Sequence, residues 1–177
     1  KILIEEGLAH PILLVRRDVI APLLKKYHID NSKVTTIDIN ASPKFELYVE
    51  RFTELRRSHG ITIADARRSM NSRNYYAMMM IDAGDADGVI AGLHAYYPAT
   101  IRPALQILKT RTGVKHVSGA YLLMFKGRML VMADTTVNID PSAEELAEIA
   151  ALTAETAKRF NLEPRIAMIS FSNFGST

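Results

Sequence analysis

The stretch Val34-Thr-Thr-Ile-Asp-Ile39, with the helical pattern that follows it over residues 43–57, decides the fold class. The six residues alternate and are rich in β-branched side chains, which predicts a strand. The same order of strand and helix recurs along the first part of the chain, which predicts a parallel sheet covered by helices. The other predicted strands are 11–15 and 87–92, and the other predicted helices are 18–28 with Asp18 as its N-cap, 62–69, 75–83 and 100–110.

The pattern changes after Gly113. Apolar runs at 117–125 and 129–132 flank Lys126-Gly127-Arg128, which predicts a hairpin with a glycine turn. A long amphipathic helix is predicted over 141–160, with Ser142 as its cap and Glu145 three residues later, and a last strand over 165–170. We therefore expect a first α/β domain over residues 1–112 and the start of a second, truncated α/β domain over 113–177. The absence of an initiator Met and the helix-tail pattern at residues 2–7 favour a fragment cut at both ends.

Composition narrows the functional classes. The chain has 177 residues, of which 48% are hydrophobic and 23% charged, enough for a sizeable packed core. The net charge of +3 is mildly basic, which favours a phosphorylated small molecule over nucleic acid. Without cysteine there is neither a disulfide nor thiolate chemistry, and the five histidines lack metal-ligand spacing. We expect no metal, no membrane partner, and neither a Rossmann fingerprint nor a P-loop.

Arginine dominates residues 51–73, where six arginines face only Glu54 and Asp65. Arginine forks match phosphate oxygens in pairs, so this stretch is a candidate anion site. The alternative is a solvated helix face with charge pairs one turn apart.

A second candidate lies between Gly92 and Pro103, where a loop leads into a predicted helix start. Thr100 and Arg102 fall in the first predicted turn, and a cation there opposes the helix dipole unless it meets an anion. Pairing of Arg102 with a nearby carboxylate is the alternative. A third candidate is Asp134 at a strand end, whereas Asn138 and Asp140 have the pattern of turn formers.

The terminal loop carries hydroxyls and small residues after a predicted strand, as anion sites of open α/β sheets do. The alternative is an N-cap for a following helix. The candidate residues are Ser170, Ser172, Asn173, Gly175 and Ser176.

Five blocks, in order, resemble the phosphotransacetylase (phosphate acetyl/butyryl transferase) family: 52–60, 84–92, 100–110, 133–141 and 165–170. The resemblance implies a three-layer α/β/α, two-domain fold like that of the isocitrate/isopropylmalate dehydrogenase class. It also implies a cleft for coenzyme A and acyl phosphate, lined by Arg56 and Arg102. The family's further catalytic Ser, Arg and Asp lie beyond Thr177.

Two departures from the transacetylase pattern stand out. Phe174 replaces a cation of the terminal loop, and residues 96–98 (Tyr-Tyr-Pro) replace a cluster of hydroxyls. In both respects the chain resembles more closely the phosphotransacetylase-like C-terminal domain of bacterial NADP-dependent malic enzymes. That resemblance implies a cytoplasmic protein whose domain binds acetyl-CoA as a regulator and supports a dimer or higher homo-oligomer. No cofactor is then expected in this domain, and NADP and a divalent metal belong to a separate malic domain.

Three functions follow as hypotheses. The first is an acyl-CoA-sensing domain of a malic enzyme. The second is a catalytic phosphate acetyltransferase, in which Ser170, Ser172 and Arg102 are candidate catalytic residues that hold acetyl phosphate. The third is an oligomerisation module that uses the apolar hairpin at 117–132.

Overall fold

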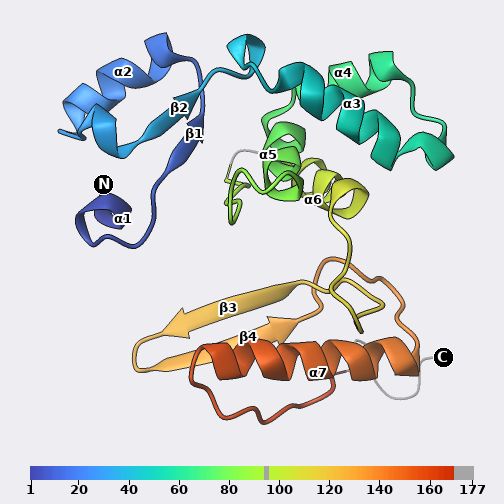
Figure 1. Ribbon diagram of the computed structural model, residues 1–177. Coiled ribbons are helices and arrows are strands. Elements are labelled where there is room, and N and C mark those ends of the chain that lie inside the picture. Colours follow the sequence, from blue (N-terminus) through green and yellow to red (C-terminus); the bar gives the residue numbers. More distant parts are fainter. Residues whose placement is uncertain (94–95, 170–177) are drawn as a thin grey trace. The chain divides into compact units, whose positions relative to one another are not determined.

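The computed structural model describes residues 1–93 and 96–169 (Figure 1). The chain divides into two compact units, Lys1–Lys109 and Thr110–Thr177. Helices and two small sheets form a mixed α/β fold in the described residues, as predicted, but the predicted alternation of strand and helix stops after β2 (Thr35–Ile37). None of the helices in the described ranges is both long enough and apolar enough to span a bilayer.

The first unit opens with a parallel strand pair. A short helix, α1 (Ile2–Glu5), precedes β1 (Ile12–Leu14), and α2 (Arg17–Lys26) connects β1 to β2 (Thr35–Ile37). Leu13 lies opposite Thr36 in the ladder, and the two strands run side by side in Figure 1. Both strands and the helix between them confirm the prediction, because a parallel pair needs a crossover of this kind. Three single-turn 3-10 helices complete the unit's short elements, at Asn31–Lys33, Ile39–Ala41 and Arg57–His59.

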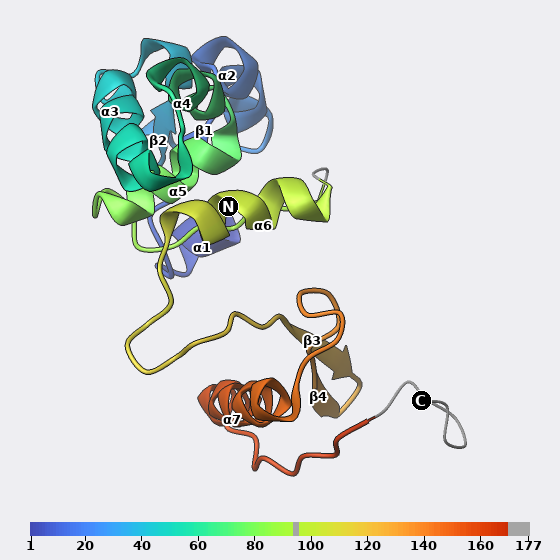
Figure 2. The same cartoon turned by 90° about the vertical axis from the view of Figure 1, so that its right-hand side faces the viewer.

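Four helices form the core of this unit. They are α3 (Phe45–Leu55), α4 (Ile63–Met70), α5 (Arg73–Asp82) and α6 (Tyr97–Ile107). The apolar faces predicted from their spacing are buried, and methionine fills much of the space between them. Figure 2 shows α3 next to α4, and α6 next to α5. Fully buried side chains are Tyr48, Val49, Phe52, Met70, Tyr76, Met79 and Pro103.

The second unit is a hairpin and a helix. Strands β3 (Ala120–Phe125) and β4 (Arg128–Ala133) pair antiparallel, with Phe125 opposite Arg128. The two-residue turn places Gly127 at a φ of 78°, which glycine adopts without a Cβ penalty. Helix α7 (Ala143–Arg159) packs on β4. The predicted hairpin is therefore confirmed.

Two predicted strands are wrong. Residues 87–92 and 165–169 form no strand, and Ser170 lies outside the described residues. Two of their apolar side chains face solvent, since Ile90 is 98% exposed and Ile169 is 85% exposed, whereas Val89 packs against the core of the first unit. An apolar run becomes a strand only when a neighbouring strand takes up its backbone hydrogen bonds, and none does so within the described ranges.

Two helix starts also differ from prediction. Helix α2 has Arg16 as its N-cap residue, and the guanidinium of Arg16 binds Asp18, so Asp18 is not the cap. Helix α6 begins at Tyr97 instead of Thr100, because Pro98 suits the first helical turn. Arg102 consequently lies in the second turn, where the dipole of the helix N-terminus acts only weakly.

Candidate anion-binding site

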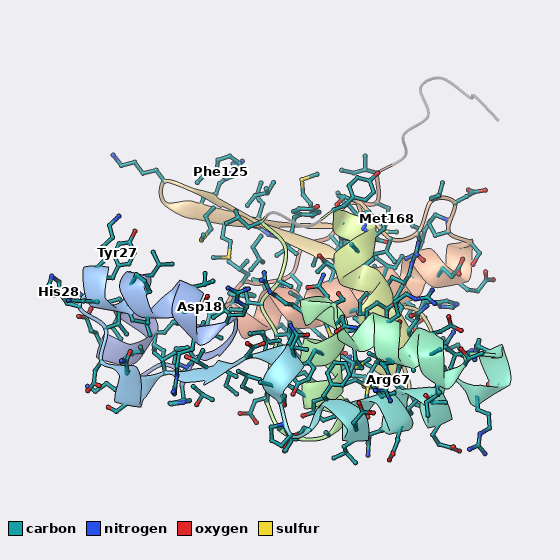
Figure 3. All side chains as sticks on the ribbon, turned by 90° about the horizontal axis from the view of Figure 1, so that it is seen from above. Asp18, Tyr27, His28, Arg67, Phe125 and Met168 are labelled. Carbon is teal, nitrogen blue, oxygen red and sulfur yellow. The ribbon has the colours of Figure 1, made fainter. Side chains whose placement is uncertain are left out.

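Most arginines of the basic stretch are neutralised by acids. Arg67 on α4 binds Glu46 on α3 through both of its terminal nitrogens, at 2.5 and 2.6 Å; Figure 3 labels Arg67. Charge pairs one helical turn apart, the alternative predicted from sequence, account for Arg57 and Arg68, whereas Arg51 and Arg67 pair with acids of other helices. The other pairs are Arg51 with Asp82, Arg57 with Glu54, and Arg68 with Asp65.

Arg56 and Arg102 have no such partner. Across residues 1–93 and 96–169, neither arginine forms an ion pair with an acid. Arg56 is half-buried directly after α3, and Arg102 is exposed on α6. Pairing of Arg102 with a carboxylate, the alternative from sequence, does not occur among these residues. Two guanidinium groups are thus available to an anion.

The phenol of Tyr75, on α5, lies near both arginines. Burial raises the pKa of Tyr75, and the positive charges of Arg102 and Arg56 partly offset that increase. Both guanidinium charges therefore act on one hydroxyl. That the two arginines form one binding site stays a prediction.

Tyr75 also joins the helices that carry these arginines. Its ring meets Phe52 edge-to-face, with the centroids 5.5 Å apart, and its hydroxyl donates to Oε1 of Gln106 over 2.6 Å. Phe52 lies one helical turn before Arg56, and Gln106 lies one turn after Arg102. Sequence reasoning missed Tyr75 and Gln106. The one available signal was the spacing of four between Arg102 and Gln106.

Thr100 carries an unsatisfied hydroxyl. Its Oγ1 is buried and has no hydrogen-bond partner within the described part of the chain. Beside it, the amide of Asn74 donates to the carbonyl oxygen of Ala99 over 2.9 Å and ties α5 to the start of α6. Buried hydroxyls in native proteins are normally satisfied, which makes Thr100 an exception; its ligand role stays a prediction.

Asp134, in the second unit, organises a loop. Its carboxylate accepts from the backbone N–H groups of Gly119, Val137 and Asn138, at 3.0, 3.2 and 2.8 Å. Burial alone raises the pKa of Asp134, but these hydrogen bonds outweigh it and hold the pKa below its ordinary value. The side-chain amide of Asn138 also donates to the carbonyl of Val117 over 3.0 Å, which ties this loop to the segment before β3; its predicted turn role stays a prediction. The ligand role of Asp134 stays a prediction.

The terminal candidates Ser170, Ser172, Asn173, Gly175 and Ser176 lie outside the described residues, so their roles stay predictions.

A pocket lies in the first unit, away from the predicted site residues. It has a volume of about 410 Å³, lies beside β2 and is lined in part by Lys44, Tyr48 and Asp85. Its polar groups bind one another, because Lys44 and Tyr48 both donate to Asp85. None of the predicted site residues lines it. The described residues also hold no group of three or more His, Asp or Glu side chains suited to a metal ion.

Comparison with known proteins places this chain in a family. A family model described as phosphate acetyl/butaryl transferase matches residues 1–177. A phosphate acetyltransferase from Synechocystis sp. is 42% identical over 176 residues, which cover 98% of this chain and 25% of that protein. One from Clostridium acetobutylicum is 38% identical over 181 residues, covering 98% of this chain and 54% of that protein.

Solved structures agree with this result. A phosphotransacetylase from Streptococcus pyogenes superposes with a TM-score of 0.86 at 41% identity, over 99% of this chain and 54% of that one. A second, from Staphylococcus aureus, gives a TM-score of 0.75 at 34% identity, over 94% and 50%. The chain therefore spans between a quarter and about half of the length of these relatives.

Proposed function

Because this chain belongs to the phosphate acetyl/butyryl transferase family, we propose that it supplies part of the substrate site of a phosphate acetyltransferase. The reaction converts acetyl-CoA and phosphate to acetyl phosphate and CoA. The observation that carries the proposal is the pair Arg56 and Arg102. Both lack an acidic partner in the described ranges, and each lies one helical turn from a side chain that contacts Tyr75. Thr100, with its unsatisfied hydroxyl, lies two residues before Arg102.

The chemistry explains why arginine suits this site. In the direction that forms acetyl-CoA, a general base takes the proton of the CoA thiol, and the thiolate attacks the acetyl carbon of acetyl phosphate. The carbon–sulfur bond forms, the bond from that carbon to the phosphate oxygen breaks, and phosphate leaves with the electron pair. Arg102 binds the phosphoryl oxygens, and Arg56 binds an oxygen of CoA or of the phosphoryl group. Both charges stabilise the leaving phosphate as its negative charge develops.

A second candidate function rests on the two departures in sequence. Phe174 and residues 96–98 replace a cation and hydroxyls of transacetylases, and fewer polar groups suit binding better than transfer. The domain would then be the acetyl-CoA-sensing part of an NADP-dependent malic enzyme. NADP and the divalent metal would belong to the malic domain. The relatives described above are named phosphate acetyltransferases or phosphotransacetylases, which supports the first candidate better.

Two structural proposals accompany this function. The first is the three-layer, two-domain arrangement of the isocitrate/isopropylmalate dehydrogenase class, with domains over 1–112 and 113–177. The second is a homo-oligomer formed through the hairpin, where Met124 is 78% exposed and Phe125, labelled in Figure 3, is 54% exposed. Sedimentation of the full-length protein as a monomer at micromolar concentration would contradict the oligomer.

The function is tested by assaying the full-length protein in two arms. One arm contains acetyl-CoA and phosphate, and the other contains malate and NADP with and without acetyl-CoA. Acetyl phosphate formation in the first arm is the expected result. Malate oxidation that responds to acetyl-CoA, without acyl transfer, would establish the second candidate instead.

A further inference from the structure

The side-chain amide of Gln106 has a fixed orientation. Its Oε1 accepts from the hydroxyl of Tyr75 at 2.6 Å. A phenol that donates can be met only by the oxygen of a primary amide, so the oxygen faces Tyr75 and the N–H₂ group faces away. Within the described residues that N–H₂ group has no acceptor, and it is not among their buried unsatisfied atoms. The N–H₂ group of Gln106 is therefore a donor that is not fully buried and that has no protein acceptor among the described residues.

The position of this donor relates it to the two arginines. Arg102 and Gln106 are four residues apart on α6, so their side chains are neighbours on one face of the helix. Arg56 approaches from the end of α3, one helical turn after Phe52, whose ring meets the Tyr75 ring with the centroids 5.5 Å apart. Two guanidinium groups and one amide donor thus gather around Tyr75.

We propose that Gln106 is a third donor of the anion site formed by Arg56 and Arg102, and that Tyr75 is the positioning residue that turns its amide outward. The ligand is a phosphoryl group, and its identity as phosphate or CoA rests on the proposed function. A phosphoryl group has three terminal oxygens, and each can accept more than one hydrogen bond. Arg56 and Arg102 do not use all of these acceptor sites, so the amide of Gln106 can donate to one that remains.

The hydrogen bond between Tyr75 and Gln106 can also have a purely structural role. The bond from Tyr75 to Gln106 also fastens α5 to α6, and its loss would lower stability whether or not an anion binds. The substitution Gln106→Glu distinguishes the two readings. It keeps the shape of the side chain and an oxygen for Tyr75, but it replaces the N–H₂ donor with a negatively charged oxygen.

The experiment titrates the full-length protein with inorganic phosphate and, separately, with CoA, and measures KM for both substrates. For Gln106→Glu we expect at least a tenfold weaker Kd for the ligand whose phosphoryl group occupies the site, with an unfolding midpoint close to that of the wild type. Tyr75→Phe should weaken the same Kd about threefold, because the amide is then free to rotate. The matched control is Tyr48→Phe, which removes a hydroxyl bound to Asp85 in the same unit and should leave both Kd values unchanged.

Each outcome is informative. An active wild type whose Kd and KM are unaltered by Gln106→Glu overturns this inference and leaves the function standing. The function is overturned and the inference is supported if the wild type forms no acetyl phosphate but Gln106→Glu weakens the affinity for phosphate or CoA. A wild type that neither binds nor reacts overturns both. If Gln106→Glu does not fold, an unchanged affinity in Tyr75→Phe overturns the inference.

Discussion

The carboxylate of Asp134 binds Asn138 twice, accepting from its backbone N–H at 2.8 Å and from its side-chain amide at 2.6 Å. The same carboxylate accepts from the N–H of Gly119, immediately before β3, at 3.0 Å. Because Asp134 itself follows β4, one side chain joins both strands at the open end of the hairpin. The loop that leads to α7 is held by the same group.

Removal of this carboxylate should destabilise the protein. We expect Asp134→Ala to lower the free energy of unfolding by about 1.5–3 kcal/mol, because several N–H groups lose a charged acceptor. Urea denaturation measures the effect. The control is Asp140→Ala, at an exposed position of the same loop, which should change stability by less than about 0.5 kcal/mol. Equal effects of the two substitutions would contradict this role for Asp134.

The lowered pKa of Asp134 gives its contribution a defined pH dependence. The hydrogen bonds of the folded protein stabilise the charged form of the Asp134 carboxylate more than the unfolded chain does. The contribution is therefore complete above the unfolded pKa of about 3.9, and it is lost as the pH falls through the lower folded pKa. Unfolding free energies measured from pH 7 down to acid should fall less steeply for Asp134→Asn than for the wild type. Parallel curves would show that another group is responsible.

Arg56 and Arg102, which have no acidic partner among the described residues, should differ in ligand binding from the paired arginines. Arg102→Ala and Arg56→Ala are each expected to weaken the affinity for CoA or phosphate about ten- to a hundredfold, the effect of losing one charge-assisted contact. Calorimetric titration of the full-length protein measures this. Arg67→Ala is the matched control, because Glu46 occupies its guanidinium. Equal losses in all three variants would point to a general effect of charge instead of a site.

The capping box at the start of α7 should contribute to stability. The hydroxyl of Ser142 accepts from the N–H of Glu145 at 3.2 Å, and the Glu145 carboxylate accepts from the N–H of Ser142 at 2.7 Å. We expect Ser142→Ala to cost about 1 kcal/mol, measured by thermal or urea unfolding. Ser142→Asp should retain most of the stability, since aspartate also caps helices well. A loss of similar size in both variants would mean that the cap is not the cause.

Local patterns predicted the local structure well. The glycine turn at Gly127 and the capping box at Ser142 are read from a few adjacent residues, and the structure contains both. The strands predicted at 87–92 and 165–170 depended on partners elsewhere in the chain, which a local pattern does not contain. Periodicity alone cannot tell a paired strand from an exposed apolar segment.

In the candidate site too, local sequence patterns identified single residues but not the contacts between helices. Sequence selected Arg56 and Arg102, but it could not show which arginines are neutralised, because partners such as Arg67 and Glu46 lie 21 residues apart. Tyr75 and Gln106 were missed for a related reason. Their hydrogen bond depends on which faces of α5 and α6 meet, and only the packed helices determine that.

The most direct measurement is acetyl phosphate formation by the full-length protein from acetyl-CoA and phosphate, with the wild type and Arg102→Ala compared side by side. We predict turnover by the wild type and a kcat/KM at least tenfold lower for Arg102→Ala. A wild type that binds acetyl-CoA but forms no acetyl phosphate would contradict this prediction.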